Sequence, residues 1–408
     1  MSEEKLNVMM VGDLVSPTGF AQVLHNIIKP NIEEFDITGL GVNYRGDPHK
    51  IGIDIFPAMI SGRGNVYGVD RLIDILKTNK IDLLFILNDS WVISYYLEAI
   101  KKELEGIAQL PKIVVYFPVD SEYHNPIWYR DFDIVSRAYT YTEFGVKVLE
   151  KAMPTMKVGI MPHGTDTEDF FKLNEDRTIA KKKLLGDKMI NELGEPDDLF
   201  FVLNANRNQP RKRLDITIEG FSIFAKDKPS GVKLYMHSGV VDSSVDLRVI
   251  SKRYGVDDRL IITSLNSGIQ RVPIQRLNLI YNACDVGINT SMGEGWGLIN
   301  TEHAVTGAPQ IVPEHSACTE LFEDCGLLMP TVTRYTFDGS QTVGKLVSPE
   351  AVAESLETLY ADKNLRKELS DKALKKFTSK EYRWQYIAEQ WKDIFKEVCD
   401  DSTVSDDN

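Results

Sequence analysis

Short apolar runs alternate with stretches of helical periodicity in the N-terminal part of the chain. Buried strands of a parallel sheet read as continuous apolar runs, and strands that alternate with helices favour such a sheet. One intervening stretch has its apolar residues at helical spacing, from Phe20 to Ile28. The pattern therefore predicts a doubly wound α/β domain. Its strands are expected at residues 6–12, 37–42, 82–87, 112–117, 137–141 and 157–162.

A second series of the same kind begins at Leu199. Between the two series, residues 172–198 are charged and helical in pattern, which predicts a solvated connection with the lysine run 181–183 exposed. Helices close the chain, and the last has an apolar stripe that is usually core. The stripe consists of Trp384, Ile387, Trp391 and Phe395. Strands of the second series are expected at residues 200–204, 233–238, 259–264, 286–289 and 309–312, and helices near 212–226, 244–254 and 273–282.

Residues 282–313 read as strand, glycine-rich turn, helix and strand. The turn holds Gly293, Gly295 and Gly297, and glycine lets the backbone approach a ligand closely. Helical pattern follows from about Leu298 to Val305. A helix that starts behind glycines presents N–H groups and the positive end of its dipole. The stretch is therefore a predicted anion site.

Two carboxylates flank this predicted site. Glu294 lies in the turn, and Glu302 lies eight residues later. If the helix starts near Trp296, Glu302 lies roughly 8–9 Å along it at 1.5 Å per residue. That is about the reach from a diphosphate at the helix tip to its ribose. By spacing alone such a pair is common in a chain with 60 acidic residues. Together with the glycines and the strand, it predicts a helix that holds a nucleoside diphosphate sugar by ribose, phosphate and sugar.

Composition narrows the classes of function. At 408 residues the chain has room for two domains. A net charge of −13 argues against general nucleic-acid binding, which needs a basic footprint. No apolar run reaches the roughly 18 residues that span a membrane, and the N-terminus does not resemble a signal peptide. The four cysteines show no metal-ligand spacing; Cys318 and Cys325 could touch, but free thiols in a cytoplasmic protein are the favoured interpretation.

An anionic ligand needs a local basic patch in so acidic a chain. Four cations follow the first strand of the second series directly, in the segment NRNQPRKRLD. Guanidinium and ammonium groups at this strand end are suited to clamping a diphosphate. Four surface cations on a loop are the alternative. The four cations are Arg207, Arg211, Lys212 and Arg213.

The motifs of the second series resemble the donor site of retaining GT-B glycosyltransferases of family four, the group with many mannosyl- and glucosyltransferases. Trp296 replaces the commoner phenylalanine, and His303 stands where alanine is usual. Arg207 and Lys212 match the diphosphate-binding pair, with Asn206 and Arg213 in place of two glycines. The matching residues of the glycine-rich stretch are Asp285, Ser291, Glu294 to Leu298, Glu302, Gly307, Pro309 and Glu320.

The resemblance is looser in the first series. Gly19 stands where the family usually has two glycines. Asp120 matches the Asp of a His-Asp pair, but Val119 occupies the place of the His, which leaves His124 as a possible substitute from the loop. Gly164 and Asp166 match the segment that closes the first domain, where His163 replaces asparagine.

The resemblance implies a GT-B fold with two facing doubly wound, Rossmann-like α/β domains and a C-terminal helix that crosses back to the first. The acceptor-side domain is expected at residues 1–175 together with the helix at about 380–400. The donor-binding domain is expected at residues 196–379, and residues 401–408 are expected to be a disordered tail. Residues 333–345 interrupt the usual pattern and are expected to form an extra loop or hairpin.

The implied activity is transfer of a hexose from a nucleoside diphosphate sugar to an acceptor hydroxyl with retention. GDP-mannose is the first expected donor and UDP-glucose the second. The acceptor is unassigned among glycans, lipids and protein glycans. No metal or other cofactor is expected, because no Asp-x-Asp motif lies in either predicted site.

The resemblance assigns two sets of site residues. The catalytic set is Asp120, Arg207, Lys212 and Glu294. The donor-binding set adds Gly19, Ser264, Leu265, Asn266, Gly295, Trp296, Gly297, Leu298, Ile299 and Glu302; Ser264 to Asn266 are expected near the base.

Two other classes stay open at this point. One is a GT-B-like epimerase or hydrolase that acts on the sugar nucleotide itself. The other is a non-catalytic nucleotide-sugar-binding protein, which the valine at position 119 allows. A dinucleotide oxidoreductase is poorly supported, because no Gly-x-Gly-x-x-Gly follows the first strand.

Overall fold

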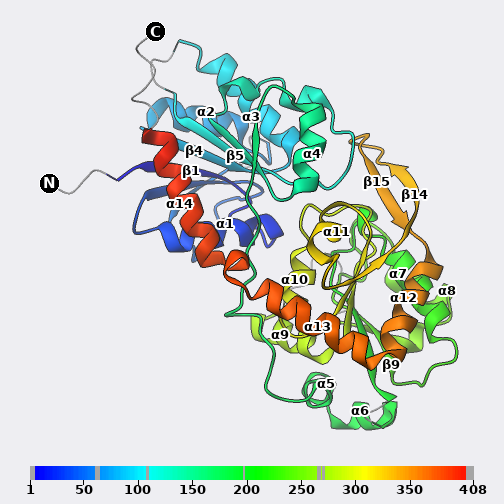
Figure 1. Cartoon of the computed structure of the whole chain (residues 1–408). Helices are drawn as coiled ribbons and strands as arrows, with labels where there is room; N and C mark the ends of the chain where they lie inside the picture. The colour runs from blue at the N-terminus through cyan, green and yellow to red at the C-terminus, as the bar shows by residue number, and fades with distance from the viewer. Residues whose placement is uncertain are drawn as a thin grey trace. The chain divides into compact units, whose positions relative to one another are not determined.

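The computed structural model describes residues 5–59, 65–106, 110–195, 198–263, 268 and 272–400. The chain forms two compact units (Figure 1). Unit 1 comprises Met1–Gly164 and Trp384–Asn408, and unit 2 comprises Thr165–Arg383. Each unit has a parallel sheet covered by helices, as the alternation of apolar runs and helical stretches predicts.

Unit 1 is built on a seven-stranded sheet in the order β3-β2-β1-β4-β5-β6-β7. All its strand pairs are parallel. The pattern missed β3 because this four-residue strand at the sheet edge is only half-buried and so has no continuous apolar run. The strands are β1 (Asn7–Gly12), β2 (Asp36–Gly41), β3 (Asp54–Pro57), β4 (Leu83–Leu87), β5 (Lys112–Tyr116), β6 (Arg137–Thr140) and β7 (Val158–Ile160).

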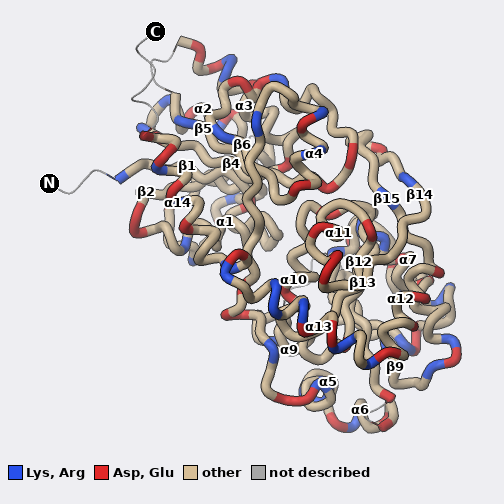
Figure 2. Tube along the Cα trace, viewed as in Figure 1, with Lys and Arg blue, Asp and Glu red and all other residues tan. Residues whose placement is uncertain are grey.

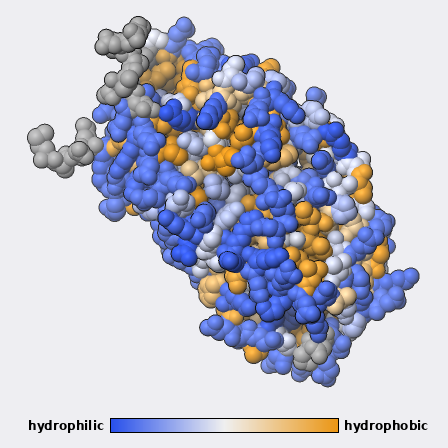
Figure 3. Space-filling view, viewed as in Figure 1, coloured by the Kyte–Doolittle hydropathy of each residue, from blue (hydrophilic) through white to orange (hydrophobic). Residues whose placement is uncertain are grey.

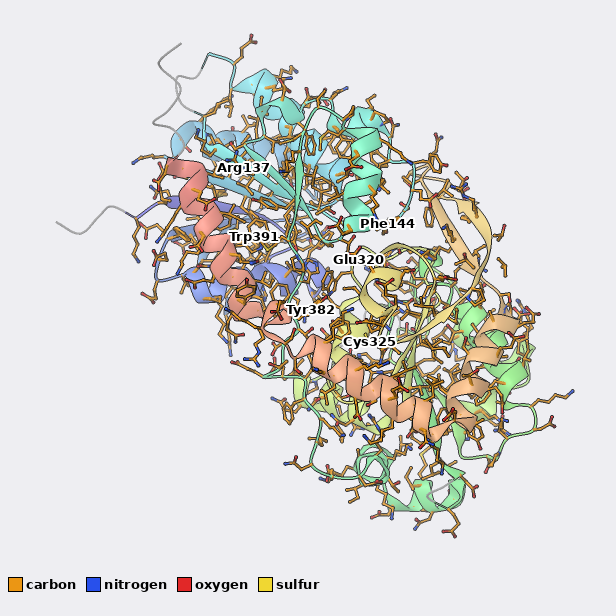
Figure 4. All side chains as sticks on the ribbon, in the orientation of Figure 1. Arg137, Phe144, Glu320, Cys325, Tyr382 and Trp391 are labelled. Carbon is orange, nitrogen blue, oxygen red and sulfur yellow. The ribbon has the colours of Figure 1, made fainter. Side chains whose placement is uncertain are left out.

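The C-terminal helix α14 (Trp384–Asp400) belongs to unit 1, as predicted. Trp391 is fully buried, with its ring edge-on to Phe85 of β4 at 5.0 Å and to Tyr116 of β5 at 4.9 Å (Figure 4). Asn31 donates to the Ala388 carbonyl at 3.1 Å. The apolar stripe of the last helix is therefore core. The other helices of unit 1 are α1 (Gly19–Asn31), α2 (Val69–Thr78), α3 (Ser90–Glu103), α4 (Glu143–Ala152) and the 3₁₀ turns η1 (Pro126–Tyr129) and η2 (Phe132–Ile134).

Unit 2 is built on a six-stranded parallel sheet in the order β10-β9-β8-β11-β12-β13. The segment predicted as an extra loop or hairpin forms an antiparallel hairpin of β14 and β15. The strands are β8 (Phe200–Asn204), β9 (Val232–Met236), β10 (Leu260–Ile262), β11 (Val286–Ile288), β12 (Gln310–Pro313), β13 (Leu327–Met329), β14 (Thr331–Thr336) and β15 (Val343–Val347).

Helices of unit 2 connect these strands in chain order (Figure 1). They include two between Asp176 and Gly194 that precede the sheet. The helices are α5 (Arg177–Leu185), α6 (Asp187–Leu193), α7 (Leu214–Ala225), α8 (Leu247–Arg253), α9 (Ile274–Ala283), α10 (Leu298–Ala304), α11 (Ser316–Phe322), α12 (Pro349–Ala361) and α13 (Lys363–Phe377), with 3₁₀ turns η4 (Pro210–Lys212), η5 (Asp257–Arg259) and η6 (Lys380–Tyr382).

Both sheets reverse their strand order beside a central strand. In unit 1 the reversal lies between β1 and β4, and in unit 2 between β8 and β11. In open α/β sheets, ligands bind outside the carboxyl ends of the strands at such a switch point. In unit 2 the loops that start there are the basic segment after β8 and the glycine-rich turn after β11.

The prediction of an exposed connection at residues 172–198 is wrong for its middle part. Lys181 on α5 is 2% exposed, and its ammonium lies 2.7 Å from the Asp285 carboxylate and donates to the Leu199 carbonyl at 3.0 Å. Asp285 also accepts from the backbone N–H of Phe201. Lysine is strongly polar, so the sequence pattern predicts an exposed side chain. Burial is tolerated at this position because the buried Asp285 carboxylate pairs with the ammonium.

A second buried cation reinforces the same region. The Arg177 guanidinium donates to the carbonyls of Asn282, in the last turn of α9, and of Cys284, the C-cap of that helix, at 3.0 and 2.5 Å. Its other nitrogen donates to the Gly307 carbonyl after α10. Carbonyls at a helix end lack intrahelical partners, so this one side chain satisfies the end of α9 and also binds the loop that follows α10. Helix α5 is consequently part of the packing of unit 2.

Charged side chains of both signs are interspersed along the chain (Figure 2). The viewed face is mostly hydrophilic with scattered apolar residues (Figure 3). Within the described ranges, no helix has both the length and the apolar character needed to cross a bilayer.

Candidate functional site

The four cations after β8 divide into three groups by their partners. Arg207 forms a two-pronged ion pair with Asp242, with Nε 2.6 Å from Oδ2. Arg213 pairs with Asp215 at 2.7 Å. Arg211 and Lys212 both reach Glu294, across the switch point. The sequence predicts Arg207 and Lys212 as a diphosphate-binding pair, but in this structure the two cations have different anionic partners.

Glu294 is the centre of the group at the switch point and is 4% exposed. Its Oε1 accepts from the Lys212 ammonium and from Asn289 Nδ2 at 3.1 Å. Its Oε2 lies 3.6 Å from Arg211 Nη1, which also donates to the Gly293 carbonyl at 2.8 Å. Arg211 thus holds both the side chain and the turn. Sequence reasoning counted Arg211 only as one of four cations.

The charges at this point stabilise one another. Burial by itself raises the pKa of Glu294, but the cations Lys212 and Arg211 outweigh it and hold the pKa at about 2. Burial lowers the pKa of Lys212, and the charge of Arg211 adds to this effect while Glu294 opposes it. At neutral pH Glu294 is therefore a carboxylate, and the ammonium form of Lys212 is the one that it favours.

Helix α10 begins at Leu298, as the glycine pattern predicts. Its N-cap Gly297 has φ of 96°, a conformation that glycine adopts without strain. Trp296 is buried, with its ring 6.1 Å from that of Tyr382, the residue labelled in Figure 4. The predicted donor-binding residues Gly295 to Ile299 thus lie in the turn and the first helical turn. With seven residues the helix has a short dipole, which leaves most of the positive charge at this point to Arg211 and Lys212.

Glu302 has surroundings of its own on α10. It is 5% exposed and accepts from the Tyr281 hydroxyl at 2.9 Å. Burial raises the pKa of Tyr281 well above its usual range, and the Glu302 charge adds to the shift. The two glutamates are therefore in contact with different groups, a pair of cations for Glu294 and a phenol for Glu302. Glu320, the later glutamate of the resemblance, lies on α11 (Figure 4).

A chain of buried amides connects the Glu294 turn to the next helix and strand. Asn289 donates to Asn300 at 2.9 Å, and Asn300 donates to Gln310 at 3.1 Å. Gln310 reaches His303 Nδ1 at 3.1 Å, and His303 Nε2 lies 3.0 Å from the Tyr281 carbonyl. Because a carbonyl only accepts, Nε2 carries the proton and Nδ1 accepts from the Gln310 amide. An alanine at this position, which is usual in the family that the sequence resembles, could make none of these contacts.

Acid is expected to destabilise the protein through its buried histidines. Burial lowers their pKa values to about 3 or 4, whereas unfolded histidine titrates near 6.5. A base with a depressed folded pKa contributes stability above pH 6.5 that is lost as the pH falls toward the folded pKa, up to about 2 kcal/mol per histidine at pH 5. Four of these residues, His124, His163, His303 and His315, are buried, and the fifth, His237, is half-buried.

The measurement is the unfolding free energy in urea at pH 7.5, 6 and 5. We expect it to fall steadily, and His303→Gln is expected to reduce the slope because one titrating group is removed. A second loss is expected only below about pH 4.5, where the depressed pKa of Glu294 begins to count. An unfolding free energy that does not change between pH 7.5 and 5 would contradict the lowered pKa values of these histidines.

The residues predicted from the first series lie at the start of α1 and in the loop that follows β5 of unit 1. Helix α1 begins at Gly19, with Thr18 as N-cap accepting from the Ala21 N–H at 3.2 Å. Asp120 accepts from Ser121 at 3.0 Å, and Val119 beside it is buried. His124 is bonded to the Tyr129 hydroxyl at 2.7 Å; burial lowers its pKa to about 4, with the charge of Asp120 opposing.

His163 and Gly164 have packing roles at the end of unit 1. His163 is buried and lies 2.8 Å from the Tyr116 hydroxyl, which donates to the Met161 carbonyl. A Cβ on Gly164 would lie 2.7 Å from Trp384 atoms, so only glycine fits there. Asp166 accepts from the backbone N–H groups of the two residues Glu168 and Asp169. The segment Ser264 to Asn266, predicted near the base, lies outside the described residues.

Other features of unit 2 are separate from the switch point. A cavity of about 440 Å³ lies between residues 168–175 and α9 and is lined by none of the predicted donor-binding residues. Among the described residues, the four cysteines are free thiols. No group of three or more histidine, cysteine, aspartate or glutamate residues suited to a metal ion is found in that part of the chain.

Comparison with solved structures identifies the architecture. HepE of Anabaena, in complex with UDP and glucose, matches with a TM-score of 0.69 and 15% identity over 96% of this chain and 100% of its own. Sucrose-phosphate synthase of Thermosynechococcus elongatus matches with a TM-score of 0.71 and 13% identity over 98% and 100%. The fold is GT-B.

A glycosyltransferase of Rickettsia africae matches this GT-B chain with a TM-score of 0.70 and 13% identity, over 98% of this chain and 100% of its own. No family model and no curated protein sequence matches the chain. At these identities the likeness establishes the fold, and the GT-B chain's activity has to be argued from its own residues.

Proposed function

We propose that this GT-B protein is a glycosyltransferase that moves a hexose from a nucleoside diphosphate sugar to an acceptor hydroxyl. The observation that supports it most is the group at the switch point of unit 2. Two cations, Arg211 and Lys212, meet the buried carboxylate of Glu294 there, where α/β sheets bind ligands. Cations suit a diphosphate, and a carboxylate accepts hydrogen bonds from sugar hydroxyls.

The chemistry assigns a task to each part. The bond between the sugar C1 and the phosphate oxygen breaks, a bond from C1 to the acceptor oxygen forms, and the acceptor proton leaves with the diphosphate. Negative charge grows on the leaving group, and Lys212, Arg211 and Arg207 are proposed to stabilise it. Glu294 is proposed to hold sugar hydroxyls and Glu302 the ribose.

Donor binding would change the partners of Lys212. In this structure its ammonium is bonded to Glu294, so the protein itself satisfies the charge that a phosphate would meet. We propose that the diphosphate accepts hydrogen bonds from this ammonium in place of Glu294, which frees lone pairs of Glu294 for the hydroxyls of the sugar. Lys212 would thus bind the diphosphate side, and Glu294 the sugar side, of the bond that breaks.

The family resemblance supports retention, and the acceptor is proposed to bind unit 1, where Asp120 lies in the loop after β5 and Gly19 begins α1. HepE has been solved with UDP-glucose, which makes this donor the first to test, with GDP-mannose, favoured by the sequence resemblance, beside it. The acceptor remains a hydroxyl-bearing molecule of unassigned class.

Donor binding is expected to raise the melting temperature of the protein. At a concentration of 100 times Kd, a ligand that binds only the folded state adds about 2.7 kcal/mol. The measurement is a thermal melt with UDP-glucose, GDP-mannose, their free nucleotides and the ADP equivalents, followed by product analysis with and without acceptor sugars. Stabilisation by the ligands of one nucleotide base, together with transfer of the hexose to an acceptor, supports the proposal. Conversion of the donor without acceptor indicates an epimerase or hydrolase, and binding without any turnover indicates a non-catalytic protein.

Transfer is further expected to proceed without a divalent ion, because the proposed charge stabilisation comes from arginine and lysine side chains. The assay is run after treatment with EDTA and again with added magnesium or manganese. Equal rates agree with the proposal, and a strict need for the ion would contradict it.

A further inference from the structure

Ser316 has an unusual backbone conformation at the junction of β12 and α11. Its φ is 50°, in the left-handed region that disfavours side chains with a Cβ. It is also 6% exposed, so its hydroxyl is withdrawn from water. Strained conformations at non-glycine residues persist where the surrounding structure requires them, and they cluster at functional sites. The contacts of the hydroxyl give a reason for serine instead of glycine.

The hydroxyl of Ser316 forms one link in a chain of hydrogen bonds. The backbone N–H of Glu294 donates to Ser316 Oγ at 3.2 Å. Ser316 Oγ lies 3.0 Å from His315 Nδ1, and His315 Nε2 lies 3.1 Å from the Ser291 carbonyl. A carbonyl only accepts, so Nε2 carries the proton, Nδ1 accepts from Ser316, and Ser316 accepts from Glu294. Every donor in the chain then has an acceptor.

Glu294 is held on its carbonyl side as well. The backbone N–H of Ala317 donates to the Glu294 carbonyl at 3.3 Å. Residues 316–317 therefore bind both backbone groups of Glu294, while Arg211, Lys212 and Asn289 bind its carboxylate or the carbonyl before it. Glycines flank Glu294 on both sides, so the turn has little rigidity of its own. Its orientation depends on these contacts.

We propose that Ser316 and His315 are positioning residues that hold the backbone of Glu294, and with it the carboxylate, in the orientation required for hexose transfer. The inference that this orientation serves transfer rests on the proposed function. Small displacements of positioned groups cost much of the rate, because reacting groups must be aligned. Neither residue carries a reacting atom.

The histidine contributes in its neutral form. Burial lowers the pKa of His315 to about 4, aided by the charge of Lys345 and opposed by hydrogen bonds to backbone and by the charge of Glu294. Protonation would place a hydrogen on Nδ1, which then no longer accepts from Ser316. Above about pH 5 the chain of hydrogen bonds is intact.

The deciding variant is Ser316→Gly, compared with Ser316→Ala. Glycine relieves the strained φ and removes the hydroxyl, whereas alanine removes the hydroxyl and keeps the strain. Ser316→Gly is therefore expected to melt at or above the temperature of the unaltered protein, and Ser316→Ala below it. Ser348→Gly is the matched control, because its hydroxyl also accepts a backbone N–H, from Ala351 at 3.1 Å, but at the start of α12 with an ordinary φ of −94°.

Two readouts separate positioning from general stability. In hydrogen–deuterium exchange, the peptide that covers residues 289–297 is expected to exchange about 5-fold faster in Ser316→Gly, and no faster in Ser348→Gly. In transfer from UDP-glucose or GDP-mannose, kcat is expected to fall about 10-fold in Ser316→Gly, while the Kd for the free nucleotide changes less than about 3-fold. His315→Gln, which keeps a donor for the Ser291 carbonyl, is expected to retain more turnover than His315→Ala.

Unaltered exchange of residues 289–297 in Ser316→Gly would overturn the proposal, and so would unaltered kcat in an active protein. If the unaltered protein neither binds nor converts any of the nucleotide sugars, the proposed function fails. The exchange experiment still decides in that case whether Ser316 holds the turn.

Discussion

Replacing Lys212 with alanine is expected to lower hexose transfer on the order of 10³-fold, the scale reported when a group aimed at developing charge is removed. Its ammonium lies beside Glu294, at the point where the diphosphate is proposed to bind. The substitution also leaves a buried carboxylate with Arg211 as its remaining cation, which costs stability. The measurement is kcat/KM for the best donor, with the melting temperature recorded in parallel.

Two further variants separate lost catalysis from lost folding. Lys212→Ala with Glu294→Gln removes the uncompensated charge and is expected to recover stability without recovering transfer. Arg213→Ala is the control for a neighbouring cation, because Arg213 pairs with Asp215 outside the Glu294 group. Adding Arg207→Ala to Lys212→Ala is expected to abolish transfer. Unchanged turnover in the double variant Arg207→Ala with Lys212→Ala would rule out the proposal that these two cations bind the diphosphate.

Replacing Lys181 with alanine is expected to lower the unfolding free energy of unit 2 by about 3–5 kcal/mol, the usual cost of removing one partner from a buried ion pair. The loss arises because Asp285 stays buried without its cation, and the Leu199 carbonyl loses a donor. The measurement is urea unfolding followed by a probe in unit 2.

The lysine run supplies its own control. Lys183, two residues further on, is 56% exposed in its side chain and pairs with Glu175 at the surface. Surface ion pairs contribute little, so Lys183→Ala is expected to leave the unfolding free energy nearly unchanged. If the two variants were equally stable, the buried pair would have no special weight in the stability of unit 2.

The glycine-rich stretch shows how far pattern reasoning reaches. The sequence predicts a strand at 286–289, a glycine-rich turn and a helix from about Leu298. The structure has β11 at Val286–Ile288 and the helix from Leu298. Local preferences decide these features, because glycine conformations, strand runs and helix starts depend mostly on residues close in sequence. The prediction that the segment binds a donor stays a prediction.

Partners across the switch point could not be predicted in the same way. Arg211 and Ser316 show no motif that assigns them to Glu294, yet both are bonded to the Glu294 turn. They come from the loops after β8 and β12, and only the pairing of β8 with β11 and of β11 with β12 brings those loops beside the turn after β11. Long-range strand pairing is a property of the whole domain, so residue spacing along the chain does not reveal it.

Lys181 is the clearest case of tertiary context overriding composition. A run of three lysines is polar by any scale, and the sequence alone favours an exposed face. The ion pair with Asp285, about 100 residues away along the chain, reverses this for one of the three and leaves Lys183 at the surface. A charge can be buried only where another part of the fold supplies its partner.

By itself, the sequence determined most of the strands and helices in chain order and the two loops that carry the cations and the glutamate, and its family resemblance implied the GT-B architecture. Periodicity and glycine placement are local, so they can be read without a structure. The tertiary structure decided which of the four cations meet Glu294, which lysine is buried, and that a serine with a left-handed backbone holds the turn. Those outcomes depend on the strand order β9-β8-β11-β12, because it alone sets which loop ends are neighbours.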